Sequence, residues 1–183
     1  MKKIILPLCI LALSVLLSCD KNNNVVLFSI NDDIALGQQV STEIANDPSY
    51  NILSRSEYPE AYAYLESMRD DILNSGKVQY KDEFEWRVHI INDDVLNAFA
   101  TPGGYIYVYT GLIKYLDEAD DLAGVMGHEL AHADLRHTVR NLQKTYGVNM
   151  LLSVALGREP GQLAQIAGQI AGKVAGLSFS REY

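Results

Sequence analysis

The residues best suited to chemistry are His128, Glu129 and His132, which stand in the order His-Glu-Leu-Ala-His. On an α-helix, residues four apart lie about 40° apart around the axis, so both histidines can direct a ring nitrogen at one ion. Glu129 lies about 100° from His128 and can reach a water on that ion without being a ligand. The spacing therefore predicts a Zn²⁺ site with His128 and His132 as ligands and Glu129 as the general base of a hydrolysis.

A short motif of this kind also occurs by chance, as two histidines and a glutamate on a solvated helix surface. The flanking residues argue against that alternative, because their apolar side chains predict a buried helix. Polar groups placed in a core need a structural or chemical reason to be there. The apolar side consists of Leu122, Val125, Met126 and Leu130.

The elements that must position this motif can be predicted from periodicity and capping. Helical spacing predicts helices over 33–46 and 59–74, and the proline-free stretch 118–144 predicts one long helix that carries the motif. Alternation predicts a strand over 84–90, and β-branched and aromatic residues predict strands over 95–100 and 105–109. We expect an α+β fold, mostly helical, with a small antiparallel sheet.

His137 is a further histidine close to the motif in the sequence. It lies nine residues after His128, which places it about 180° around a continuing helix, so it is not predicted as a ligand. Its expected role is packing or surface exposure. A role in tuning the site stays open if the helix ends early.

A longer stretch resembles a known family. Residues 97–113 (Asn-Ala-Phe-Ala-Thr-Pro-Gly-Gly-Tyr-Ile-Tyr-Val-Tyr-Thr-Gly-Leu-Ile), then 122–132, then Arg136-His137, resemble the family-48 zinc metallopeptidases of the HtpX, BepA and Oma type. The resemblance covers the chain from about Ile34 to its end and implies a zincin-like metallopeptidase domain binding one Zn²⁺.

The resemblance also implies a third zinc ligand, a glutamate on a later helix within a pattern of Ser-Arg, two residues and Glu. Ser180-Arg181-Glu182-Tyr183 match the opening of that pattern. The ligand is therefore expected just beyond Tyr183, with the domain incomplete at its C-terminus. Glu182 comes two positions too early, Asp134 faces away on the helix, and Glu159 falls in a predicted loop.

In enzymes of this type, an extended substrate commonly pairs with the edge of a sheet beside the metal. The resemblance makes Asn97, Ala98, Phe99, Pro102, Gly103 and Gly104 the candidate substrate-binding residues. Backbone pairing has little sequence preference, which suits cleavage of unfolded or misassembled proteins. Pro102-Gly103-Gly104 could equally be only a hairpin turn.

The N-terminus predicts delivery to the cell envelope. Lys2 and Lys3 precede a short apolar run, and Leu-Leu-Ser before Cys19 resembles a bacterial lipobox. We expect a signal peptide over 1–18, lipidation of Cys19, a linker over 19–31 and a peptidase domain over 32–183. The expected localisation is membrane-anchored and facing the periplasm. The alternative is a plain signal peptide with an incidental cysteine.

Composition limits the other possibilities. The net charge of -8 becomes more negative when Lys2 and Lys3 leave with the signal, which disfavours nucleic acid as a partner. With Cys9 removed and Cys19 lipidated, no disulfide is available. The apolar tail over 150–177 predicts tightly packed helices, with a membrane hairpin as the alternative.

The predicted function is a zinc endopeptidase of envelope quality control. The rivals are a non-catalytic, chaperone-like zinc lipoprotein and an integral membrane protease.

Overall fold

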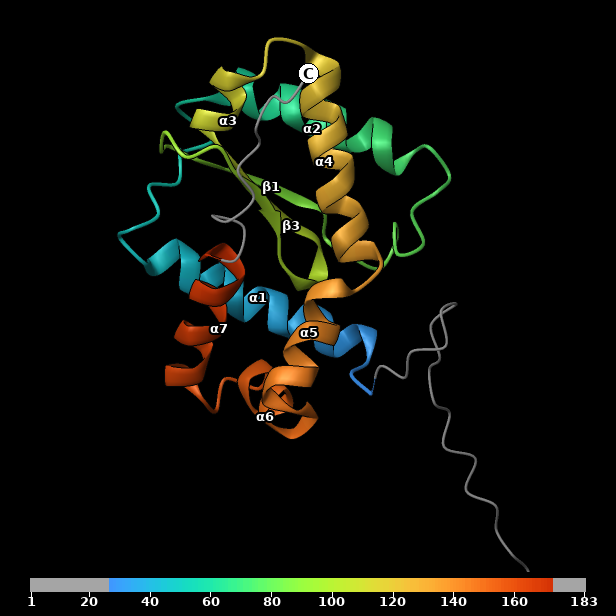
Figure 1. The fold of residues 1–183 in the computed structure, drawn as a ribbon, viewed down its shortest axis with the longest axis vertical. Helices are drawn as coiled ribbons and strands as arrows, with labels where there is room; N and C mark the ends of the chain where they lie inside the picture. The colour runs from blue at the N-terminus through green and yellow to red at the C-terminus, as the bar shows by residue number, and fades with distance from the viewer. Residues whose placement is uncertain (1–26, 173–183) are drawn as a thin grey trace, which may run out of the picture.

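The computed structural model describes residues 27–172, in which a small sheet lies between two groups of helices (Figure 1). Helices α2 and α4 pack on one face of the sheet, and α1, α5, α6 and α7 pack on the other. The elements are α1 Ile30–Asn46, α2 Pro59–Leu73, β1 Arg87–Ile91, β2 Ala98–Ala100, the 3₁₀ turn η1 Pro102–Gly104, β3 Tyr105–Tyr109, α3 Thr110–Tyr115, α4 Ala119–Asp134, α5 His137–Tyr146, α6 Val148–Ala155 and α7 Pro160–Gly172.

The expected α+β fold is confirmed, but the sheet is mixed instead of antiparallel. Its strand order is β1-β3-β2, with β2 antiparallel to β3 and β1 parallel to it. The connection over 92–97 crosses the end of the sheet, so β3 enters between the two earlier strands. At this crossing the N–H of Gly111 donates to the carbonyl of Asp93 at 2.8 Å, and a Cβ on Gly111 would lie 2.3 Å from the carbonyl carbon of Asp94. Only glycine fits this close approach.

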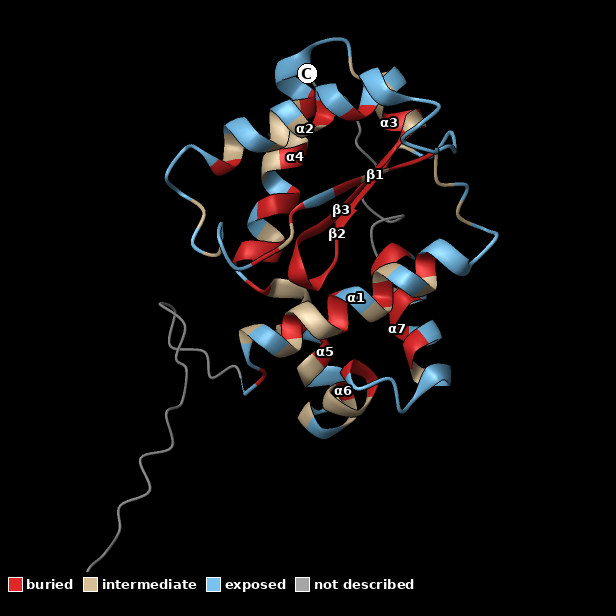
Figure 2. Cartoon of the chain, turned by 180° about the vertical axis from the view of Figure 1, so that it is seen from behind, coloured by how far each residue is buried: buried red, intermediate tan, exposed pale blue. Residues whose placement is uncertain are grey.

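Alternating residues of the strands supply the two halves of the core, which Figure 2 shows as buried strands between partly exposed helices. Phe99 and Tyr107 stack with ring centroids 4.6 Å apart on the side of α1 and α7. Ala98 and Ala100 face the other side, where α4 packs. The two small side chains allow the motif helix to lie close to the backbone of β2.

The predicted helix over 59–74 is confirmed, and the predicted helix over 33–46 begins earlier. Ser29 and Asp32 form a capping box, in which the Ser29 hydroxyl accepts from the Asp32 N–H and the Asp32 carboxylate accepts from the Ser29 N–H. Phe28, just before this cap, is fully buried. Among the described residues, the core therefore already includes Phe28, which precedes α1.

The single helix predicted over 118–144 is wrong, because the chain breaks between α4 and α5. Arg136 adopts a left-handed conformation with φ of 56°, which ends α4 and turns the chain into α5. A second positive φ, 45° at Trp86, shortens the strand predicted over 84–90, so β1 begins only at Arg87. The predicted alternation of buried and more exposed residues nevertheless holds through 84–90.

The tail forms two short helices, α6 and α7, whose apolar side chains join the core beside α1. Within residues 27–172, every helix is too short or too polar to cross a membrane. The predictions for the signal peptide, Cys19 and Ser180 to Tyr183 lie outside the described residues.

Candidate active site

Helix α4 brings the two predicted zinc ligands together. The Nε2 atoms of His128 and His132 lie 3.0 Å apart, with His128 exposed and His132 half-buried. Two Zn–N bonds of about 2.0 to 2.1 Å at a tetrahedral angle place the nitrogens about 3.3 Å apart. The pair therefore fits a shared zinc ion with a small adjustment of the rings. Burial, followed by the nearby histidines, lowers the pKa of His132, which favours the neutral ring that a metal requires.

Glu129 is buried beside this pair, with 6% of its surface exposed. Its carboxylate accepts a hydrogen bond from the backbone N–H of Ala100 in β2. Burial raises the pKa of Glu129 to about 7, and the Ala100 hydrogen bond only partly opposes the rise. A carboxylate with a pKa near neutrality suits a general base that also returns the proton.

The hydrogen-bond pattern of β2 directs part of its backbone toward Glu129. The N–H of Thr101 donates to the carbonyl of Tyr105, and the N–H of Tyr109 donates to the carbonyl of Asn97. Because antiparallel pairs alternate, Ala98 and Ala100 fall in the pairs without hydrogen bonds, and their backbone groups point away from β3. Ala100 uses its N–H on Glu129, so the edge of the sheet and the predicted base are directly joined.

The remaining candidate substrate-binding residues lie in three other places. Asn97 is buried at the start of β2, and its Oδ1 has no hydrogen-bond partner among the described residues. Phe99 points to the opposite face of the sheet from α4. Pro102, Gly103 and Gly104 form the buried turn between β2 and β3, against α1 and Trp86.

His137 is the residue whose position the sequence did not predict. Its Nδ1 lies 3.1 Å from the Nδ1 of His132, because the break at Arg136 redirects the chain. The helical wheel placed His137 on the far side of one continuous helix. The left-handed conformation of Arg136 produces this turn. Sequence periodicity gives no sign of it, because it does not report the backbone conformation of a single residue.

The other acidic side chain of α4 is structural. Asp134 accepts hydrogen bonds from the backbone N–H groups of Gln79 and Tyr80, at 3.1 and 2.8 Å, as its predicted orientation away from the metal requires. Within residues 27–172, no group of three or more histidine, cysteine or acidic residues converges on a metal position.

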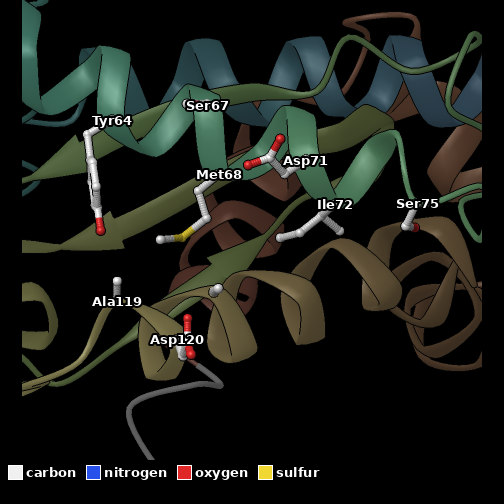
Figure 3. Close-up of a pocket in the computed structure, with 9 residues that line it drawn as sticks. Tyr64, Ser67, Met68, Asp71, Ile72, Ser75, Ala119 and Asp120 are labelled. Atoms are coloured by element: carbon white, nitrogen blue, oxygen red, sulfur yellow. The ribbon is translucent and has the colours of Figure 1, made fainter.

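A groove of about 510 Å³ lies further along α4, between its first turns and α2 (Figure 3). Tyr64, Met68 and Ile72 of α2 face Ala119 and Asp120 of α4. Its α4 residues precede His128 by five or more positions, about 7 Å or more along the axis. The groove is thus separate from the histidines.

Comparison with known proteins agrees with this geometry. The family model "Peptidase family M48" matches residues 59–181. The chain belongs to peptidase family M48. Peptidases of this family are zinc-dependent, and the M48 match includes the motif helix and the edge strand.

Named M48 relatives come from mitochondria and from bacteria. The chain is 25% identical over 158 residues to "Metalloendopeptidase OMA1, mitochondrial" of Bos taurus, covering 73% of this chain and 30% of that protein. It is 31% identical over 153 residues to "Beta-barrel assembly-enhancing protease" of Yersinia pestis, covering 78% of this chain and 32% of that protein. The Escherichia coli protein of the same name is 33% identical over 102 residues, covering 51% and 21%. The chain thus spans about a third or less of these relatives.

Proposed function

We propose that this chain carries the catalytic motif of a zinc-dependent endopeptidase that cleaves unfolded or misassembled proteins of the cell envelope. The observation that carries the proposal is the position of Glu129, buried beside two converging histidines and hydrogen-bonded to the edge strand. A site that only stored zinc would gain nothing from a desolvated carboxylate at this position.

In the proposed mechanism, His128 and His132 would hold Zn²⁺ through their Nε2 atoms. Zinc bound there would polarise the scissile carbonyl and acidify the attacking water. Glu129 removes a proton from this water and delivers it to the leaving amine. The Ala100 N–H orients the Glu129 carboxylate for both transfers.

The proposed substrate lies as an extra extended strand beside β2. The outward backbone groups of Ala98 and the carbonyl of Ala100 would pair with the substrate backbone, which gives affinity without selecting particular side chains. Such a site favours extended, unfolded segments over folded domains. Of the relatives, the Yersinia pestis protein is described by its name as a β-barrel assembly-enhancing protease, which makes envelope proteins the proposed substrate class.

The proposed location is the periplasmic side of a membrane, through acylation of Cys19 after removal of residues 1–18. The lipobox-like sequence supports this proposal. Acylation is tested by the mass and detergent partitioning of the mature protein, which Cys19→Ala should change. An unchanged mass and unchanged partitioning would contradict the lipid anchor.

The catalytic proposal is tested with Glu129→Gln in the full-length protein. The amide keeps the shape of the side chain but cannot take the proton, so we expect about 10²-fold or greater loss of casein cleavage with zinc binding retained. His89→Gln, a histidine on β1 away from the motif, is the matched control and should retain both properties. If Glu129→Gln cleaves casein at the wild-type rate, the endopeptidase mechanism is wrong, and a chaperone-like zinc protein becomes the better explanation.

A further inference from the structure

The break between α4 and α5 brings a third histidine to the motif. Five residues along an unbroken helix would rotate His137 by about 140° from His132. The left-handed conformation of Arg136, with φ of 56°, instead turns the chain so that the Nδ1 atoms of His132 and His137 lie 3.1 Å apart. The ring planes meet nearly at a right angle, 78°, with centroids 4.9 Å apart.

The atoms involved distinguish a ligand from a supporting residue. His132 directs Nε2 at the Nε2 of His128, at 3.0 Å, and Nδ1 at the Nδ1 of His137. The two nitrogens of an imidazole lie on different edges of the ring. An ion shared by the two Nε2 atoms is therefore on the side of the His132 ring that His137 does not contact.

We propose that His137 is a positioning residue that accepts a hydrogen bond from the Nδ1–H of the zinc ligand His132. This inference rests on the proposed function. When Nε2 of His132 carries the lone pair for zinc, its proton is on Nδ1, and the unprotonated Nδ1 of His137 accepts it. The bond fixes both the tautomer and the ring orientation of His132, as groups hydrogen-bonded to metal-binding histidines do.

His137 is held in place independently of His132. Arg136, which is 5% exposed, donates from Nε and Nη2 to the two carboxylate oxygens of Asp33, at 2.7 and 2.8 Å. The next turn of α5 is anchored in the core by Val139 and Leu142, which are 1% and 2% exposed. The acceptor is therefore preorganised by the fold, and its removal should affect zinc binding more than folding.

The experiment compares three substitutions of His137 in the full-length protein. Asn places its Oδ1 where the histidine Nδ1 was and keeps the acceptor. Gln moves its polar atoms one position further out, and Phe removes them. The readouts are the zinc dissociation constant, by competition with a fluorescent chelator, and the number of imidazole ligands, by X-ray absorption. His89→Phe is the matched control, because His89 lies on β1 and stacks on Tyr107.

We expect His137→Phe and His137→Gln to weaken zinc binding by about 10- to 100-fold, with the imidazole count unchanged. His137→Asn should restore most of the affinity, and His89→Phe should leave it unchanged. Wild-type affinity in His137→Phe, or equal losses in Asn and Gln, would overturn the proposal, as would one imidazole fewer in His137→Phe. If the Phe variant does not fold, the difference between Asn and Gln decides. A wild-type protein that binds no zinc would instead refute the proposed function.

Discussion

The buried ion pair between Arg136 and Asp33 gives the sharpest test of how the break in the motif helix is maintained. Arg136 donates two hydrogen bonds to the Asp33 carboxylate, and its Nη2 also donates to the carbonyls of Phe28 and Ser29. The side chains of Arg136 and Asp33 are 5% and 1% exposed. Removing one partner of such a pair typically costs about 3 to 5 kcal/mol, because the other charge stays buried and unpaired.

We predict that Arg136→Met lowers the free energy of unfolding by about 3 to 5 kcal/mol at pH 8. Methionine has the same difficulty with a positive φ as arginine, so the comparison isolates the lost interactions. The double variant Asp33→Leu/Arg136→Met removes both charges and should recover most of the loss. Urea unfolding of the zinc-free protein, followed by far-UV circular dichroism, measures all of these values without a contribution from metal binding.

The pH dependence of this loss is a second part of the same prediction. Burial raises the pKa of Asp33 to about 6, and Arg136 opposes the rise through its hydrogen bonds and charge. An acid with a raised pKa costs stability as the pH rises from its unfolded value through its folded value. Without Arg136 the folded pKa rises further, so the cost of Arg136→Met should be at least about 1.4 kcal/mol smaller at pH 5 than at pH 8. A loss below about 1 kcal/mol at pH 8, or one independent of pH, would refute the argument.

Three further predictions concern the elements around the site. Gly37→Ala should destabilise the fold by about 1 to 3 kcal/mol in urea unfolding, because the new Cβ would lie 2.0 Å from the carbonyl oxygen of Pro102. The control Gly168→Ala, whose Cβ would have open space around it, should be neutral or stabilising. Burial lowers the pKa of His89 to about 4, so the fold should lose up to about 3 kcal/mol as the pH falls from about 6.5 to 4. His89→Phe should abolish that acid-dependent loss, and an unchanged pH profile would contradict it. Burial raises the pKa of Glu129 to about 7, so its ionised form destabilises the zinc-free protein at high pH. In that protein, Glu129→Gln should raise the unfolding free energy by about 2 to 3 kcal/mol at pH 8 and leave it unchanged below pH 4.5. Equal effects at both pH values would be inconsistent with the raised pKa.

The sequence predicted the parts of the site that depend on local spacing. His128 and His132 meet because four residues make little more than one turn, and the helix over 59–74 follows from its apolar face and its first proline. The strand over 105–109 was predicted from its aromatic and β-branched residues and is confirmed. Such features need no knowledge of distant partners.

The parts that sequence reasoning missed depend on contacts between distant residues. The left-handed Arg136 is stabilised by Asp33, which is 103 positions away in the chain. No local sequence pattern therefore predicts the break between α4 and α5. His137 was placed on the wrong side of the helix for this reason. The parallel pairing of β1 with β3 is likewise set by the crossing near Gly111, whereas alternation within a strand specifies faces but not neighbours.

The role proposed for the edge strand can be examined from the substrate side. Ala98 and Ala100 direct backbone groups away from β3, so a paired substrate should depend on alternate backbone N–H groups. N-methylation along a casein-derived peptide should block cleavage at alternate positions and be tolerated between them. Uniform sensitivity or uniform tolerance along the peptide would argue against strand pairing.

The most direct measurement of the central claim is a zinc titration of the full-length protein after chelation, with new α-amines from casein as the readout. The claim predicts no cleavage without zinc, and a rate that rises with added zinc and levels off at one ion per chain. The same titration of a His128→Asn/His132→Asn variant should give no cleavage at any zinc concentration tested. Cleavage that persists after complete removal of zinc, or that survives the loss of both histidines, would contradict the assignment of this site as a zinc peptidase centre.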